Sequence, residues 1–223
     1  MADKNRLDST KAPALPFAPV QYDRQVQDST NNILRQYFNT IDNVTGQLLG
    51  DGGGRYLSFP HIAAQDTTSQ LTTDNTATKV LWNTLDSGLG FTLNIDSTAT
   101  ATYTGIYKID YSFQFANTDT QIHEAYVWLR VNNVDVIGSA SKFSVPNKHG
   151  GIDGYLVAYS SITFTMQAGD YVALYWAASK ANVISPAANG IYMEAYPAQT
   201  VPFAMPSIPS AIGSIVFVSG VTT

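Results

Sequence analysis

The chain has 223 residues, a formal net charge of −5 and no cysteine. Hydrophobic residues make up 44% of it, and charged residues only 13%, which is about half the share usual in globular proteins. The lack of cysteine excludes disulfides and thiolate metal sites, and an acidic chain without basic clusters is a poor nucleic-acid binder. Only two glutamates occur, whereas Asp, Asn, Thr, Ser, Gly and Tyr are common, so the composition favours strands and turns.

Residues 1–25 are polar and then interrupted by prolines at three-residue spacing, which predicts an extended segment without a core. We interpret it as an anchor arm that lies on a partner, and the alternative is an unattached tail. The apolar residues between the prolines, which would contact that partner, are Leu15, Phe17 and Val20. Residues 1–20 contain no apolar stretch typical of a secretory signal, and no run in the chain is long enough for membrane insertion.

A helix is predicted over residues 26–50, with Ser29 or Asp28 as its cap and Gly50 at its end. Its apolar residues step by three and four and form a heptad stripe: Leu34, Tyr37, Ile41, Val44 and Leu48. This stripe either packs against its own domain or forms a short stalk between identical subunits. Residues 51–79, which begin with the glycines of DGGG, are interpreted as a hinge and linker.

Residues 80–223 are predicted to form one all-β domain, a sandwich or barrel of about eight to ten strands. The segment TYTGIYKIDYSFQF gives the clearest signal, because large apolar residues alternate with polar ones and predict a strand with one buried face. These apolar residues are Tyr107, Ile109, Tyr111, Phe113 and Phe115. Further strands are expected at 80–85, 90–95, 122–131, 134–137, 155–166, 170–177 and 212–218.

Two turns predict hairpins. Asn132-Asn133 joins 122–131 to 134–137, and Gln167-Ala168-Gly169 joins 155–166 to 170–177. The last strand, IGSIVFV, is apolar on both faces and is therefore expected in the interior of a sheet.

No catalytic or cofactor site is predicted, so we expect a protein that is not an enzyme. His61, His123 and His149 are not at metal-ligand spacing, and there is no nucleophile elbow. Several aspartates fall beside turns, where calcium binding is an alternative without a supporting motif: Asp96, Asp110, Asp119, Asp135, Asp153 and Asp170. Two glutamates in the whole chain argue against a hydrolase with paired carboxylates.

Four motifs resemble the C1q/TNF-like jelly roll and occur in that family's order over about residues 80–220. They are TGIYKIDYSFQF, AYVWLRVNNVDVIGSA, FTMQAGDYVALYW and SIVFVSG. The resemblance implies an all-β C1q/TNF-like jelly-roll sandwich, preceded here by an extended arm and a short helix, and packed as a homotrimer. Tyr107, Tyr111, Phe113 and Phe115 would then serve the core or the interface between subunits.

The combination of proline-rich start, helix and jelly roll resembles virion structural proteins of tailed bacteriophages. This resemblance implies a homotrimer assembled in the host cytoplasm, anchored to other virion proteins of tail or capsid through the arm. Its jelly roll would be displayed as part of a fibre or spike for host attachment. The alternatives are a capsid decoration protein and a carbohydrate-binding module that stacks residues such as Trp176 on a host surface glycan.

Overall fold

The structure is a computed structural model, and it describes residues 13–17, 20–49, 59–182 and 189–221. The chain divides into two compact units, residues 1–59 and 60–223, and each is described by itself. Gly50 and the glycines of the predicted hinge lie outside the described residues.

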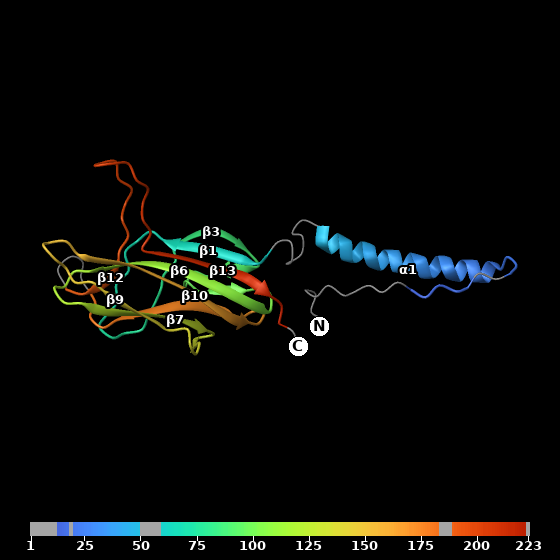
Figure 1. Cartoon of the computed structure of the whole chain (residues 1–223), viewed down its shortest axis with the longest axis horizontal. Coiled ribbons are helices and arrows are strands. Elements are labelled where there is room, and N and C mark those ends of the chain that lie inside the picture. The colour runs from blue at the N-terminus through green and yellow to red at the C-terminus, as the bar shows by residue number, and fades with distance from the viewer. Residues whose placement is uncertain (1–12, 18–19, 50–58, 183–188, 222–223) are drawn as a thin grey trace. The chain divides into compact units, whose positions relative to one another are not determined.

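The first unit contains one long helix, α1 (Arg24–Leu49), at the position where the sequence predicts a helix (Figure 1). Its cap is Asp23, not Ser29 or Asp28 as predicted from the sequence. The Asp23 carboxylate accepts hydrogen bonds from the amides of Gln25, at 2.7 Å, and Val26, at 3.4 Å. These bonds satisfy two of the free amides at the helix start, and the helix begins at Arg24, two residues earlier than predicted.

In the described residues from 60 onward, the strands form two antiparallel sheets (Figure 1). The first sheet has the order β10-β6-β13-β1-β3, with β12 also beside β6. Its strands are β1 (His61–Asp66), β3 (Thr84–Leu89), β6 (Gly105–Asn117), β10 (Gly154–Met166), β12 (Ile191–Met193) and β13 (Ala211–Ser219).

The second sheet has the order β4-β5-β11-β7-β8, with β2 also beside β11 and β9 beside β7. Its strands are β2 (Thr78–Lys79), β4 (Phe91–Leu93), β5 (Ala99–Ala101), β7 (His123–Val131), β8 (Val134–Asp135), β9 (Ser141–Val145) and β11 (Tyr171–Ala178).

The strand order is that of a jelly roll. Eight strands follow the order β1-β13-β6-β10 in one sheet and β5-β11-β7-β9 in the other, and the chain crosses repeatedly between the sheets. The first and last strands of this set, β1 and β13, are neighbours, with His61 opposite Val216. The predicted fold class, an all-β jelly-roll sandwich that follows an extended segment and a helix, is confirmed.

The core lies between the sheets and is rich in aromatic side chains from β6. Tyr107, Tyr111, Phe113 and Phe115 are all buried, as the alternation of this strand predicts. Tyr111 and Phe113 stack at 4.8 Å, and Phe115 packs against Trp176 at 5.7 Å between ring centroids. These rings supply much of the apolar area that stabilises the sandwich.

Three expectations about the strands are corrected. The sandwich begins with β1, which lies in the segment interpreted as linker, and not at residue 80. The segment 80–83 lies between β2 and β3 and is not a strand. β10 and β11 do not form a hairpin, because β10 pairs with β6 in the first sheet and β11 with β7 in the second.

The other predicted hairpin is present. β7 pairs with β8, and Asn132 and Asn133 both adopt positive φ, 50° and 64°. That backbone conformation is the one required by a two-residue turn whose twist matches the strands.

Candidate functional site

The strongest candidate for an interaction surface is the solvent-facing side of the first sheet, which we call the outer face. It consists of the side chains of β6, β10 and β13 that point away from the core. The apolar members that are exposed are Tyr155, Val157 and Tyr159 of β10 and Ile212, Val216 and Val218 of β13. Singly exposed apolar residues are common, but several of them on one face of a sheet, here on the two strands that flank β6, are typical of a surface that binds another protein.

The registers place these residues in rows across the sheet. Tyr159 and Ile212 lie on either side of Ser112 of β6, and Thr163 and Val216 lie on either side of Lys108. Side chains opposite one another on neighbouring strands are in contact range, so the polar Ser112 and Lys108 of β6 lie between the exposed side chains of β10 and those of β13.

The outer face carries little charge. Among the outward-facing side chains of β6, β10 and β13, all of them described, only Lys108 and Asp110 are charged, and their charged groups lie 3.1 Å apart. The Tyr159 hydroxyl donates to the Asp110 carboxylate at 3.0 Å. Burial alone would raise the pKa of Asp110, but hydrogen bonds from Ser161, Lys108 and Tyr159 outweigh it and hold the pKa below its usual value. The two charges thus neutralise each other, as the interior of a protein interface requires.

The predicted stalk residues form a stripe along α1. Leu34, Tyr37, Ile41 and Val44 are partly exposed, while the positions between them are mostly polar and exposed. Within α1 the stripe therefore has the heptad pattern predicted from the sequence, and the side chain of Leu48 lies outside the described residues. An amphipathic helix with an uncovered stripe is only marginally stable unless something packs on it.

The predicted anchor residues present their side chains to solvent. Phe17 is 99% exposed, Val20 is fully exposed, and Leu15 is about half exposed. Exposed apolar side chains on an extended segment gain nothing within their own unit, so these three are available for a partner.

The second sheet carries an aromatic cluster on its solvent-facing side. Trp128 of β7 stacks on Tyr175 of β11 at 6.1 Å, and the Arg130 guanidinium lies 4.0 Å from the Tyr175 ring centre. Asp135 accepts hydrogen bonds from the Trp128 indole, at 2.7 Å, and from Arg130, at 2.6 Å. The bond from Arg130, followed by that from Trp128, lowers the pKa of the Asp135 carboxyl.

The prediction that Trp176 stacks on a glycan is wrong, because this side chain is completely buried in the core. The period of β11 puts Trp176 on the core side and Tyr175 on the solvent side, so the aromatic residues that can face a sugar are Tyr126, Trp128 and Tyr175. Sequence reasoning chose Trp176 over Tyr175 because β11 is apolar on both faces, so its alternation does not show which side is buried.

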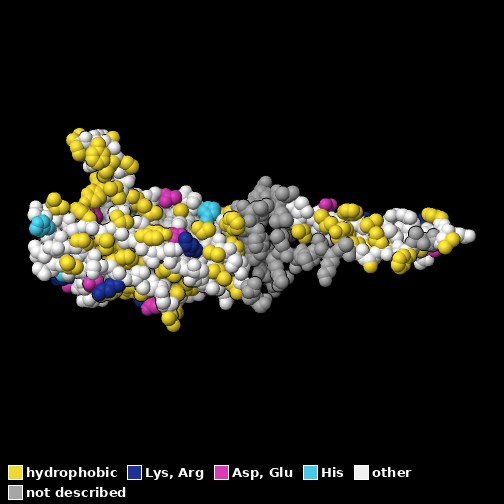
Figure 2. Space-filling model, viewed as in Figure 1, with side chains coloured by type: hydrophobic (Ala, Val, Ile, Leu, Met, Phe, Trp, Pro, Cys, Tyr) yellow, Lys and Arg dark blue, Asp and Glu magenta, His cyan; other side chains and the backbone are white. Residues whose placement is uncertain are grey.

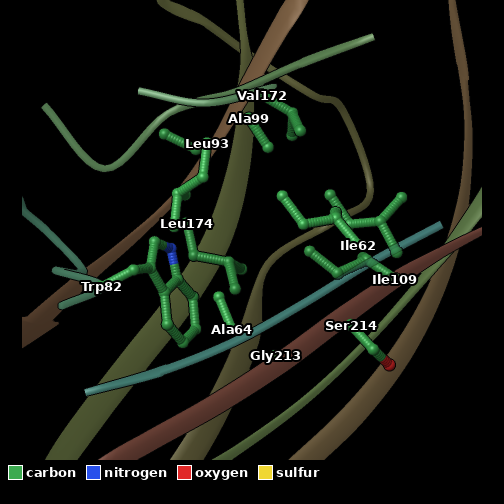
Figure 3. Close-up of a pocket in the computed structure, with 12 residues that line it drawn as sticks. Ile62, Ala64, Trp82, Leu93, Ala99, Ile109, Val172, Leu174, Gly213 and Ser214 are labelled. Carbon is green, nitrogen blue, oxygen red and sulfur yellow. The ribbon is translucent and has the colours of Figure 1, made fainter. Parts of the chain in front are cut away.

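A cavity of about 30 Å³ lies between the sheets, surrounded by apolar side chains such as Ile62, Trp82, Ile109 and Leu174 (Figure 3). Gly213 of β13 makes room for the indole, since a Cβ at this position would come within 2.8 Å of the Trp82 ring. Ligand pockets generally measure about 300–1,000 Å³, so this cavity is a packing gap and not a binding site.

In the described residues, the histidines and turn aspartates form no cluster of three or more potential metal ligands. The Nε2 atom of His123 lies within hydrogen-bond distance of the Asp119 carboxylate, at 2.8 Å, and this contact lowers the pKa of Asp119. Within the described residues, no three histidine, aspartate or glutamate side chains are grouped so that they could hold a metal ion. Over the same residues, no helix has the length and apolarity that a membrane crossing needs.

Comparison with known proteins assigns neither a family nor a function to this chain. No family model and no curated protein matches the chain. Among solved structures, the globular domain of the zebrafish complement 1qA protein is similar, with a TM-score of 0.44 and 12% sequence identity over 73% of this chain and 98% of that one. The assignment as a jelly roll rests on the strand order itself.

Proposed function

We propose that this chain is a homotrimeric structural and interaction protein of a bacteriophage virion. Residues 1–25 anchor it to other virion proteins, and the jelly roll is displayed as part of a fibre or spike that takes part in host attachment. The observation that supports the trimer is the outer face of the first sheet, which exposes six large apolar side chains from β10 and β13, is nearly uncharged and is uncovered in the single chain.

The outer face suits burial against identical copies. A permanent interface between subunits is depleted of charge and enriched in aromatic and aliphatic side chains, as this surface is. Tyrosines such as Tyr155 and Tyr159 bury large rings while their hydroxyls keep hydrogen-bond partners.

The helix supports the same arrangement. Two heptads are too short for a stable isolated coiled coil, but a stripe of this kind adds to an interface that the sandwich has already formed. The helix would then act as a short stalk between the anchor arm and the displayed jelly roll.

The virion role is supported by the sequence resemblance and by the exposed Leu15, Phe17 and Val20 of the arm. If the protein instead covers the head, the same trimer would serve as a capsid decoration protein. Gold labelling of purified particles separates these placements, since label on the tail or its fibres supports attachment and label over the head supports decoration.

The trimer is tested with one pair of matched variants. Val157→Asp places a charge in the outer face, whereas Val134→Asp places the same charge at β8 of the other sheet. The two valines are 57% and 69% exposed, so neither change should unfold the subunit. We expect Val157→Asp to weaken trimer association at least about tenfold and Val134→Asp to leave it unchanged, as measured by light scattering and native mass spectrometry. A monomeric or dimeric wild-type protein at micromolar concentration contradicts the proposal.

A carbohydrate-binding role is the second candidate, favoured by the aromatic cluster on the other sheet. Flat stacked rings beside hydrogen-bonding groups, such as Trp128 and Tyr175 next to Asp135, are the chemistry that binds sugars. Loss of binding to host glycans in Trp128→Ala, with the trimer intact, would support this candidate.

A further inference from the structure

Residues 196–208 form a narrow hairpin that projects from the sandwich between β12 and β13, which we call the finger (Figure 1). Backbone hydrogen bonds close it at two levels, between Tyr196 and Ile208 and between Gln199 and Met205, at distances of 2.9–3.1 Å. The finger is thus held by its own backbone hydrogen bonds and belongs to neither of the two sheets.

The tip of the finger is apolar and uncovered. Val201 is 79% exposed and Phe203 is 61% exposed, and both lie in the run VPFAMP. Figure 2 shows hydrophobic side chains gathered over the projection. Exposing two large apolar side chains to water is unfavourable. A partner that buries them at the end of this preformed hairpin would gain the corresponding hydrophobic free energy.

The base of the finger is held firmly by the sandwich. Ser210 is buried, its amide donates to the Asp66 carbonyl at 2.9 Å, and its hydroxyl donates to the Thr68 carbonyl at 2.6 Å. On the other side, the Ala195 amide donates to the Ser69 hydroxyl at 3.0 Å. A clamped base fixes the direction of the finger, so docking it costs little conformational entropy.

The finger is continuous with the outer face. The Tyr196 hydroxyl donates to the Tyr155 hydroxyl at 2.9 Å, and Tyr155 is the outward residue of β10 at that end of the sheet. Burial, together with the bond to Tyr155, raises the pKa of Tyr196, so the Tyr196 hydroxyl stays protonated at neutral pH. Whatever covers the outer face therefore also lies beside the base of the finger.

The charge pattern favours a second copy over a lipid surface. No charged residue occurs from Ala195 to Thr223, whereas segments that bind anionic membranes carry Lys or Arg beside their apolar residues. The outer face of another copy is equally poor in charge, so the two surfaces match in chemistry.

We propose that the finger of each subunit packs on the neighbouring copy within the trimer, with Phe203 and Val201 buried in that contact. This inference rests on the proposed homotrimer and adds a second contact to it. Besides the contact between sheet faces, each subunit places its finger on a neighbour. The neighbouring subunit supplies the apolar cover that the finger lacks in its own chain.

The experiment uses the absence of cysteine from the chain. Phe203→Cys in the full-length protein is labelled with benzophenone maleimide, which restores an aromatic group at the tip, and is then irradiated. We expect covalent species at two and three times the mass of the chain. Ile95→Cys, labelled in the same way, is the control, because Ile95 is fully exposed on a turn of the other sheet, and it should give at least about tenfold less product.

A second measurement keeps the inference open to refutation. The double variant Val201→Ser with Phe203→Ser should raise the concentration at which the trimer dissociates by about tenfold or more, since buried aromatic anchors dominate interfaces. A wild-type monomer would refute the trimer itself. A wild-type trimer that gives no cross-link above the Ile95 control, or whose fingers can be changed to serine without effect on dissociation, would refute the finger contact alone. The double serine variant is also tested for binding to vesicles of phosphatidylcholine and phosphatidylglycerol. If it loses vesicle binding that the wild-type protein shows, while its trimer is unchanged, the finger belongs to a lipid surface and the inference is overturned.

Discussion

Trp176 is the largest side chain buried completely in the core, and it fills the space beside Phe115 between the two sheets. Its indole N–H has no hydrogen-bond partner among the described residues, so its contribution to stability comes from packing. Trp128 lies on the solvent side of the second sheet. Its ring is partly exposed, and its indole N–H donates a hydrogen bond to Asp135.

This contrast predicts different costs for the two tryptophans. Trp176→Ala should lower the free energy of unfolding by about 3–5 kcal/mol, because it leaves a cavity in a closed core. Trp128→Ala should cost about 1 kcal/mol or less, the usual contribution of a cross-strand pair. Chemical denaturation of the two variants measures both, and Trp176→Phe should retain most of the stability that alanine loses. Equal costs for the two alanine variants would contradict this assignment of the core.

Several exposed or partly buried carboxylates have pKa values lowered below the usual 3.8 by their hydrogen-bond partners. They are Asp74, Asp96, Asp110, Asp119 and Asp135. A carboxyl that is more acidic in the folded chain stabilises the fold fully above the unfolded pKa and loses this contribution as the pH falls through the folded value.

We therefore expect the melting temperature to be nearly constant from neutral pH down to about pH 5 and to fall below about pH 4. Circular dichroism melts in a series of buffers measure it. A melting temperature that rises between pH 4 and pH 2 would show that these contacts do not stabilise the fold.

At the scale of elements, the sequence could predict those strands whose alternation is strong over many residues. β6 is the best case, because its alternating buried positions from Tyr107 to Phe115 are all large and the outward ones between them are polar. β1 was missed because its buried positions are Ile62, Ala64 and Asp66, of which only one is a large apolar residue. The short strands β9 and β12 offer too few positions for a period to be recognised.

The connection from β10 to β11 shows a second limit. Gly169 adopts a positive φ of 90° in a tight turn, which is the signal of a hairpin in the local sequence. Whether the chain returns in the same sheet or crosses to the other depends on how the whole sandwich closes, and residues within the turn do not encode that choice. The outer face and the finger were missed for the same reason, since a side chain's exposure depends on distant strands.

The anchor arm, residues 1–25, allows a further prediction. Deleting residues 1–20 should leave the sandwich and the trimer intact, because α1 begins at Arg24 with its cap at Asp23 and the sandwich begins at β1. The truncated protein should fail to join virions, since it lacks Leu15, Phe17 and Val20. Its melting temperature, its mass by light scattering and its copy number in purified particles are the measurements. Normal incorporation of the truncated chain would place the anchor elsewhere.

At the scale of the whole molecule, stability is expected to come from packing between sheets and between subunits, without metal ions. Treatment with EDTA should leave the melting temperature unchanged within about 1 °C, because no cluster of three potential ligands occurs in the described residues. Differential scanning fluorimetry with and without added calcium measures this directly. A loss of several degrees in EDTA, restored by calcium, would instead reveal a site among the turn aspartates.

The position of β13 has a consequence for the synthesis of the protein on the ribosome. β13 is made after every other strand of the sandwich, yet it lies between β6 and β1 and pairs with both. Until it emerges, each of these strands has an open edge along which other nascent chains could pair. The first sheet can therefore close only after nearly the entire chain has left the exit tunnel, so products of premature termination before β13 should be recognised by chaperones and proteases and should not accumulate in folded form.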